Sequence, residues 1–222
     1  MNFVTCGQMK ILEKRADSRG LSYYQMMENA GTMAAEIICE KYGASIKGTK
    51  VIIFCGKGNN GGDGFVAARK FLEQDAIVTI VLVDGPPAAG DAITNFKLIK
   101  KQVQIIDMVK TDSPFMEIRG RQEIMIDAVY GTGFHGALNS CALKAASFVN
   151  QFKGKALIVS LDIPSGLGGD AVRKAQIDQN AVRADYTITF HNKKPVHIQG
   201  FSKEYCGQVI IADIGIDEDL LW

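Results

Sequence analysis

The sequence predicts an α/β protein with a mostly parallel, doubly wound central sheet. Short continuous apolar runs recur along the chain, and this is the pattern of strands covered on both faces. Stretches with apolar residues at three-and-four spacing alternate with these runs, and strands that alternate with helices indicate a parallel sheet with helical crossovers. No linker-like or low-complexity segment interrupts the 222 residues, so we expect a single domain over residues 1–222.

Roughly the first forty residues are expected to be helical, because their apolar residues recur at the spacing of one buried face. The members of this face are Met26, Met27, Ala30, Met33, Ala34, Ile37 and Ile38. Residues 51–55 form a continuous apolar run and predict the first strand. A glycine-rich turn follows, and then a helical stretch that carries Val66, Ala67, Phe71 and Leu72.

The alternation then repeats. We expect strands at 77–83, 123–126 and 156–161, and helices at 92–101 and 141–152. Two later β-rich runs, 186–190 and 209–211, have no long helix between them, so they should extend the sheet at one side. Ligands of open α/β sheets bind outside the carboxyl ends of the strands. The loops after Cys55, Val83, Ile126 and Leu161 are therefore where a functional site is expected.

The composition excludes several classes of protein. With 25 Lys and Arg against 24 Asp and Glu the net charge is +1, and no basic stripe with interleaved aromatic residues suggests a nucleic-acid partner. No apolar run approaches the roughly 18 residues of a membrane span. The N-terminal residues resemble neither a signal nor a transit peptide, so a soluble, cytoplasmic protein is expected.

The cysteines and histidines do not form metal-ligand patterns. The five cysteines are odd in number and contain no C-x-x-C, which indicates reduced thiols rather than a disulfide framework or a zinc site. The three histidines show none of the usual ligand spacings.

The first informative loop is GKGNNGGDG, residues 56–64. Gly56, Gly58 and Gly61 satisfy G-x-G-x-x-G between a predicted strand and a predicted helix. Such glycines let the backbone approach a phosphate at a helix start. The alternative is a tight turn in which Asp63 only complements the helix dipole. Five glycines in nine residues favour the phosphate loop, because glycine is entropically costly. A Walker loop is excluded because no Gly-Lys-Ser/Thr follows.

The second and third loops each begin with an aspartate at the end of an apolar strand. Asp127 should be partly desolvated, which would tune its pKa for proton transfer, although an Asp in this position can also cap the next element. Asp162 occupies the same place in LDIPSG. Ser165 does not fit a nucleophile elbow, because Ile163 stands where its first glycine belongs, so an oxygen-ligand or hydrogen-bonding role is favoured.

Taken in order, GKGNNGGDG, DAVYGTGF and LDIPSG resemble the NAD(P)H-hydrate epimerase family. MMENAG near the start and ADYTITF, with Lys194 and Asp213-Ile214-Gly215, near the end are also similar. The resemblance runs from about Met9 to Ile216. It implies a Rossmann-like three-layer α/β/α sandwich, a homodimer, and interconversion of the R and S forms of hydrated NADH and NADPH, a repair of damaged nicotinamide cofactor.

The resemblance also implies site residues. The substrate contacts would be Asn59, Asn60, Gly61, Gly62, Asp63, Gly131, Thr132, Gly133, Phe134, His135, Gly136, Ala137 and Asp162. One potassium ion per subunit would be held by Asn60, Asp127 and Ser165, whose oxygen atoms suit a hard cation. Asp127 is the candidate catalytic acid or base. A cation beside Asp127 would lower its pKa, which makes it a better base than acid.

Two other functions remain open from the sequence. The same fold occurs as a non-catalytic nucleotide-binding or scaffold module, for example in an mRNA-decapping scaffold. The presence of Asn60, Asp127 and Asp162 disfavours that alternative. An NAD-dependent dehydrogenase would use Asp84, after the second strand, as a ribose ligand. No hydride-transfer partner is evident for it. Many bacterial relatives carry a dehydratase domain as well, so a separate dehydratase partner is expected if this chain is complete.

Overall fold

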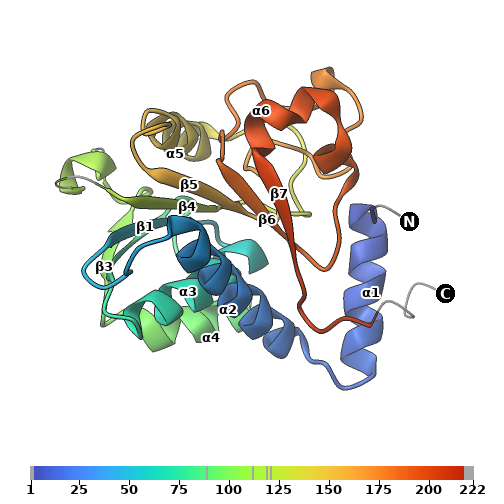
Figure 1. Ribbon diagram of the computed structural model, residues 1–222, viewed down its shortest axis with the longest axis horizontal. Helices are drawn as coiled ribbons and strands as arrows, with labels where there is room; N and C mark the ends of the chain where they lie inside the picture. The colour runs from blue at the N-terminus through green and yellow to red at the C-terminus, as the bar shows by residue number, and fades with distance from the viewer. Residues whose placement is uncertain (1–2, 89, 112, 119, 121, 218–222) are drawn as a thin grey trace.

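The computed structural model describes residues 3–88, 90–111, 113–118, 120 and 122–217, and seven strands within them form one sheet (Figure 1). The strands are β1 Lys50–Cys55, β2 Ile77–Leu82, β3 Gln104–Asp107, β4 Ile124–Ala128, β5 Leu157–Leu161, β6 Tyr186–Phe190 and β7 Gln208–Ala212. Their order across the sheet is β3-β2-β1-β4-β5-β6-β7, and each neighbouring pair is parallel. The direction of the strand order therefore reverses between β1 and β4, where a ligand crevice is expected.

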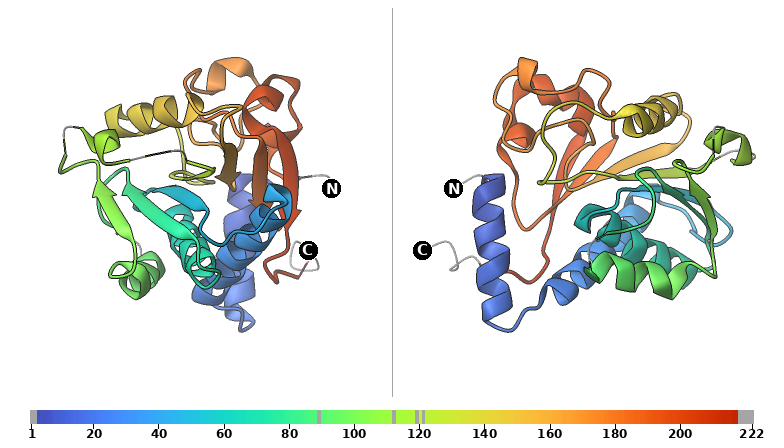
Figure 2. Two further views of the ribbon diagram at one scale, coloured as in Figure 1. Left: turned by 60° about the vertical axis from the view of Figure 1, so that its left-hand side comes forward. Right: turned by 180° about the vertical axis from the view of Figure 1, so that it is seen from behind.

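Helices cover both faces of the sheet (Figures 1 and 2). Helices α2, α3 and α4 lie on one face, and α5 and α6 lie on the other. The α-helices are α1 Cys6–Ser18, α2 Tyr23–Tyr42, α3 Asn59–Leu72, α4 Gly90–Ile99, α5 Ser140–Asn150 and α6 Lys203–Cys206. Short 3₁₀ turns occur at η1 Pro114–Glu117, η2 Lys174–Gln176, η3 Pro195–Ile198 and η4 Gly200–Ser202. This is the predicted Rossmann-like three-layer arrangement.

The continuous apolar strands are explained by this two-sided burial. In β1, Ile53 and Cys55 pack into the core beneath α2 and α3, whereas Ile52 and Phe54 pack into the core beneath α5. Every second residue of a strand points to the same face. A strand covered on both faces therefore has to be apolar at every position, as residues 51–55 are.

The predicted elements are found with small shifts in their ends, and two features differ. The helical N-terminal stretch is two helices, because α1 ends at Ser18 and a new N-cap, Ser22, accepts a hydrogen bond from the Gln25 N–H to start α2. Strand β3 was not predicted. It has four residues at the sheet edge, of which only Ile106 is buried, so it lacks the apolar run that marked the central strands.

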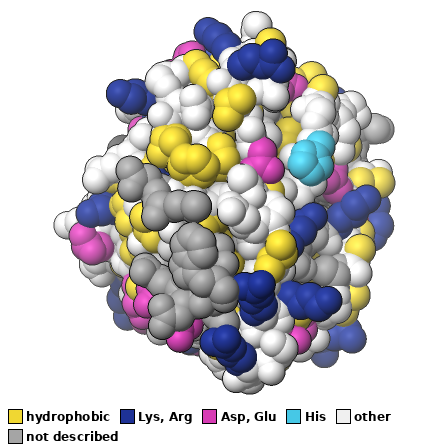
Figure 3. Space-filling model, turned by 90° about the vertical axis from the view of Figure 1, so that its right-hand side faces the viewer, with side chains coloured by type: hydrophobic (Ala, Val, Ile, Leu, Met, Phe, Trp, Pro, Cys, Tyr) yellow, Lys and Arg dark blue, Asp and Glu magenta, His cyan; other side chains and the backbone are white. Residues whose placement is uncertain are grey.

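The surface agrees with the balanced charge of the sequence. On the face shown in Figure 3, basic and acidic side chains are interspersed among polar and hydrophobic ones in the part not covered by grey atoms. Within the described residues, no helix combines the length and the apolar character needed to cross a membrane.

Candidate functional site

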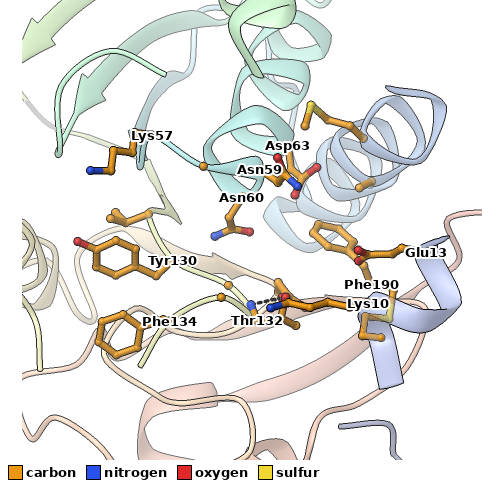
Figure 4. A pocket seen from close by; sticks show the side chains of 18 of the residues that line it. Lys10, Glu13, Lys57, Asn59, Asn60, Asp63, Tyr130, Thr132, Phe134 and Phe190 are labelled. Carbon is orange, nitrogen blue, oxygen red and sulfur yellow. Dashed lines mark hydrogen bonds between the residues drawn. The ribbon is translucent and has the colours of Figure 1, made fainter. Parts of the chain in front are cut away.

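A cavity of about 600 Å³ opens beyond the carboxyl ends of the strands (Figure 4). Its walls come from α1, the start of α3, and the loops after β1, β4 and β5. Ten of the thirteen residues expected to contact substrate line it: Asn59, Asn60, Asp63, Gly131, Thr132, Gly133, Phe134, His135, Ala137 and Asp162. The glycine loops that stood out in the sequence therefore meet at one place.

Asn60 is the most unusual polar group of the first loop. Its side chain reaches from the first turn of α3 into the cavity (Figure 4) and is only 8% exposed. Neither its amide oxygen nor its amide nitrogen has a hydrogen-bond partner in the described structure. A buried amide without partners costs about 1–3 kcal/mol, so this group is expected to bind a ligand.

Gly61 and Gly62 do not line the cavity. A Cβ on Gly61 would collide with the carbonyl oxygen of Gly56, and a Cβ on Gly62 would lie 2.6 Å from the Met27 sulfur. The Gly62 N–H donates to the Gly58 carbonyl within the helix start, so it is not directed at a ligand. These two glycines allow α3 to begin against the β1 loop and against α2.

The second loop brings backbone close to the cavity at Gly131. A Cβ there would lie 2.8 Å from Asp162 Oδ2 and 3.4 Å from Asn60 Cγ, so a side chain at 131 would fill the space between them. Gly133 lies in open space, and Gly136, with φ +88°, turns the loop without lining the cavity.

Two aromatic rings form the far wall. Tyr130 and Phe134 stack with ring centroids 4.9 Å apart and an interplanar angle of 16°. The Tyr130 hydroxyl donates to Asp84 Oδ2 at 2.8 Å, and Asn139, the N-cap of α5, donates to Asp84 Oδ1 at 2.9 Å. Asp84 is thus already engaged on both oxygens, in contrast to the free ribose ligand that a dehydrogenase would require.

Asp162 and Lys194 form a buried ion pair in the cavity wall. Lys194 Nζ lies 2.6 Å from Asp162 Oδ1 and also donates to Thr189 Oγ1 and to the Phe190 carbonyl. The Thr132 N–H donates to the other oxygen, Oδ2, at 3.1 Å. Burial alone would raise the pKa of Asp162, but the Lys194 ammonium outweighs it and lowers this pKa. Asp162 is therefore held ionised beside the cavity, with its backbone in the left-handed region at φ +61°.

Asp127 lies behind the cavity wall and is 1% exposed. Ser160 Oγ and the Ser165 N–H donate to its Oδ2, while Ser165 Oγ, at 2.5 Å, and the Val129 N–H donate to its Oδ1. Burial raises the pKa of Asp127, and these four hydrogen bonds offset part of the effect. They occupy roughly all four lone-pair positions of a carboxylate. The position suits holding the loops after β4 and β5 together.

The three expected potassium ligands converge on the same loop. Ser165 Oγ donates to Asp127 and accepts from the Tyr130 N–H, which leaves one of its two lone pairs free. Asn60 lies beside Gly131, which follows Tyr130 in the chain, and the amide oxygen of Asn60 has no hydrogen-bond partner. Asp127 has a full set of neutral donors and no cationic partner among the described residues. An amide oxygen, a hydroxyl oxygen and a carboxylate are donors of the kind that a hard monovalent cation takes.

Helix α1 supplies residues that the sequence did not point to. Lys10 and Glu13 line the cavity opposite α3, and Lys194 joins them from the segment after β6. No local pattern marks Lys10 or Glu13, since a charged residue on an amphipathic helix is usually a solvated one. The family resemblance includes Lys194 but implies no role for it.

Comparison with known proteins gives a consistent result. The model of the family described as "YjeF-related protein N-terminus" matches residues 23–196. An Archaeoglobus fulgidus protein named "Bifunctional NAD(P)H-hydrate repair enzyme Nnr" is 37% identical over 98% of this chain and 42% of its own length. A Nitrosopumilus maritimus protein named "NAD(P)H-hydrate epimerase" is 31% identical over 96% of this chain and 95% of its own. The chain thus spans less than half of the first relative.

A solved structure supports the fold. The crystal structure of yeast ynu0 (YNL200c) superimposes with a TM-score of 0.77, covering 95% of this chain and 87% of that one at 20% sequence identity.

Proposed function

This chain belongs to the YjeF-related protein N-terminus family, and from that premise we propose that it is an isomerase that interconverts the R and S forms of hydrated NADH and NADPH. The names of its relatives support this reaction. The observation that carries it is the cavity itself, in which two glycine loops face an ionised, buried carboxylate. Its volume of about 600 Å³ lies within the range of small-molecule sites, roughly 300–1,000 Å³.

The reaction needs one proton donor and one proton acceptor. Hydration of a reduced nicotinamide ring adds water across an enamine double bond, so the hydroxyl is on the carbon next to the ring nitrogen. Inversion at that carbon follows when the hydroxyl leaves as water, assisted by the nitrogen lone pair, and water returns to the opposite face. No oxidant or reductant is consumed. The protein has to place a proton on the departing oxygen and accept one from the incoming water.

Asp162 is our candidate acceptor. Its pKa is held low by Lys194, and its Oδ2 accepts one hydrogen bond, from Thr132, leaving room for another. Gly131 keeps the approach to Oδ2 open. The substrate phosphates would bind at the start of α3 beside Asn59 and Asn60, where helix N–H groups and the dipole favour anions. The aromatic wall of Tyr130 and Phe134 offers an apolar surface for a flat ring.

Direct proton transfer by Asp127 is harder to reconcile with its contacts. The group would first have to give up the Ser165 hydroxyl or one of its other three donors. We therefore propose that Asp127 fixes the loops after β4 and β5, so that Gly131 and Asp162 stay in register, and that its charge stabilises a cation.

We also propose one potassium ion per subunit. Asn60 Oδ1 and Ser165 Oγ would supply oxygens, and Asp127 the negative charge, in direct contact only if one of its hydrogen bonds is displaced. A bound ion would supply a fixed positive charge next to the second glycine loop. Crystals grown with rubidium in place of potassium should show an anomalous peak next to Asn60 and Ser165. Its absence there, with rubidium bound elsewhere, would remove this part of the proposal.

The remaining proposals concern the oligomeric state, the partner enzyme and the cellular location. We propose a homodimer that acts in the cytoplasm and passes the S form to a dehydratase, on another chain or as a further domain. The relatives named bifunctional repair enzymes and the five free thiols support this setting. The domain assignment to residues 1–222 stays a prediction.

The function is tested with a mixture of the R and S hydrates and an S-specific dehydratase. The dehydratase alone should consume the S form and then continue only at the spontaneous rate of epimerisation. With this protein added, the R form should disappear rapidly, and Asp162→Asn should abolish the acceleration. An R-form rate equal to the spontaneous one, together with tight binding of NADP-type ligands, would support the non-catalytic binding module instead.

A further inference from the structure

Asp63 is a carboxyl group of the cavity that the mechanism above does not use. It follows the first turn of α3 and points into the cavity (Figure 4), which Asp162 and Lys194 also line. Its side chain takes part in no hydrogen bond or ion pair in the described structure, unlike Asp127 and Asp162. Because it lies beyond the first turn, Asp63 is poorly placed to serve only as a complement to the helix dipole, whose effect is confined to that turn.

Burial and the neighbouring charges give Asp63 and Asp162 different protonation states. Burial raises the pKa of Asp63 well above its ordinary range, and the negative charges of Asp162 and then Glu13 raise it further. The Lys194 ammonium opposes this, but it is in contact with Asp162. Burial and Asp162 likewise raise the pKa of Glu13, against Lys194 and Lys10. One carboxyl group is therefore held protonated and another ionised across one cavity, which is how sites separate an acid from a base.

A second observation shows that a ligand belongs next to Asp63. Asn60, one turn earlier on α3, points into the same cavity with both amide atoms unpartnered. A bound polar molecule that satisfies this amide would lie within reach of the Asp63 side chain, because residues three apart share a helix face.

Given the epimerase function proposed above, we propose that Asp63 is the catalytic acid, whose carboxyl O–H protonates the departing hydroxyl while Asp162 receives a proton from water on the opposite face. Glu13 is the positioning residue: after burial and Asp162, its charge, contributed by α1, also favours the protonated form of the Asp63 carboxyl. Helix α1 is thus part of the active site.

The step balances in atoms and electrons. The carbon–oxygen bond breaks with its electron pair on oxygen, the Asp63 proton completes a water molecule, and the nitrogen lone pair forms a carbon–nitrogen double bond. Water then attacks the other face, the double bond returns its pair to nitrogen, and the excess proton passes to Asp162. Exchange with solvent restores the protonated Asp63 and the ionised Asp162. By microscopic reversibility, the reverse epimerisation passes through the opposite pair of protonation states.

The test compares Asp63→Asn with a matched control, Glu36→Gln, which makes the same carboxyl-to-amide change at an exposed position on α2. We expect Asp63→Asn to lower kcat by about 10²- to 10⁴-fold, the range for loss of one acid–base group, with little change in KM. Glu36→Gln should retain wild-type kcat. Thermal melts of both variants establish that they are folded.

Glu13→Gln provides a readout that a structural role would not move. If Asp63 must be protonated, kcat falls as the pH rises through the Asp63 pKa. Removal of the Glu13 charge lowers that pKa, so the falling limb should move to lower pH in Glu13→Gln and be absent in Asp63→Asn. A folded Asp63→Asn enzyme with wild-type kcat, or a limb unmoved in Glu13→Gln, would overturn the assignment. A wild-type protein that does not epimerise would instead overturn the proposed function.

Discussion

Lys194 and Asp162 are 32 residues apart in the chain and meet at 2.6 Å in the cavity wall, with the lysine side chain fully withdrawn from solvent. Burial of two charges is costly, and it is tolerated when both are hydrogen-bonded. Here Thr189, Phe190 and Thr132 complete the set of partners. The ion pair fixes the protonation state of the residue that we assign as proton acceptor.

Lys194→Met should destabilise the protein by about 3–5 kcal/mol, because it leaves the Asp162 carboxylate buried and unpaired. Urea unfolding measures the change. The double variant Lys194→Met with Asp162→Asn should recover part of the loss, since the unpaired charge is gone. A single variant as stable as the wild type would show that the pair is not desolvated in solution.

Gly131→Ala should abolish activity while the fold survives. The added Cβ would lie 2.8 Å from Asp162 Oδ2 and would occupy the space between Asp162 and Asn60. Gly133→Ala is the matched control, because a Cβ there meets nothing within 4 Å. Steady-state kinetics and a thermal melt of both variants check this. Equal activity of the two variants would contradict the position assigned to the substrate.

Gly61→Ala should destabilise the fold by about 1–3 kcal/mol or more, because its Cβ would meet the Gly56 carbonyl oxygen and backbone cannot yield easily. Gly58→Ala, at the N-cap with open space around it, should change stability far less. Chemical denaturation of the pair tests whether the glycine loop is required for packing as well as for ligand approach.

Asp127→Asn should lower the free energy of unfolding by about 1–3 kcal/mol, because its amide N–H₂ would face donors that now lack an acceptor. Ser165 N–H and Ser160 Oγ both point at the oxygen that is lost or turned. Denaturation with and without potassium measures the effect. If the variant keeps wild-type stability and loses only catalysis, direct proton transfer by Asp127 is favoured over the role in holding loops.

His197 should make the fold sensitive to mild acid. Burial, and then the Lys194 charge, lower its pKa from 6.5 to about 3. Below about pH 6.5 the unfolded chain therefore binds a proton at His197 that the folded state does not bind. The free energy of unfolding falls as the pH drops from about 6.5 towards 3, by at most about 5 kcal/mol. The difference in unfolding free energy between wild type and His197→Asn, followed over this range, should shrink on acidification.

The arrangement of strands was predictable because each strand is determined by its own local sequence pattern. Residues 51–55 are apolar at every position, and only a strand buried on both faces has that requirement. Once the strands were placed, parallel topology brought the loops with Asn60, Asp127 and Asp162 to one edge of the sheet. Strand β3 was not predicted because only one of its four edge residues, Ile106, is buried, so the strand needs no such run.

Tertiary structure decided the protonation state and the role of each carboxyl group. Asp127 and Asp162 both follow apolar strands and look alike in the sequence. Asp127 is surrounded by neutral donors and does not reach the cavity. Asp162 forms an ion pair with Lys194 and lines the cavity. Burial raises the pKa of Asp63, and the charges of Asp162 and then of Glu13, on a helix with no motif, raise it further. A pKa depends on burial and on charges a few ångströms away, which come from segments distant in the chain, so a local pattern places a carboxyl group at a site without assigning its protonation state.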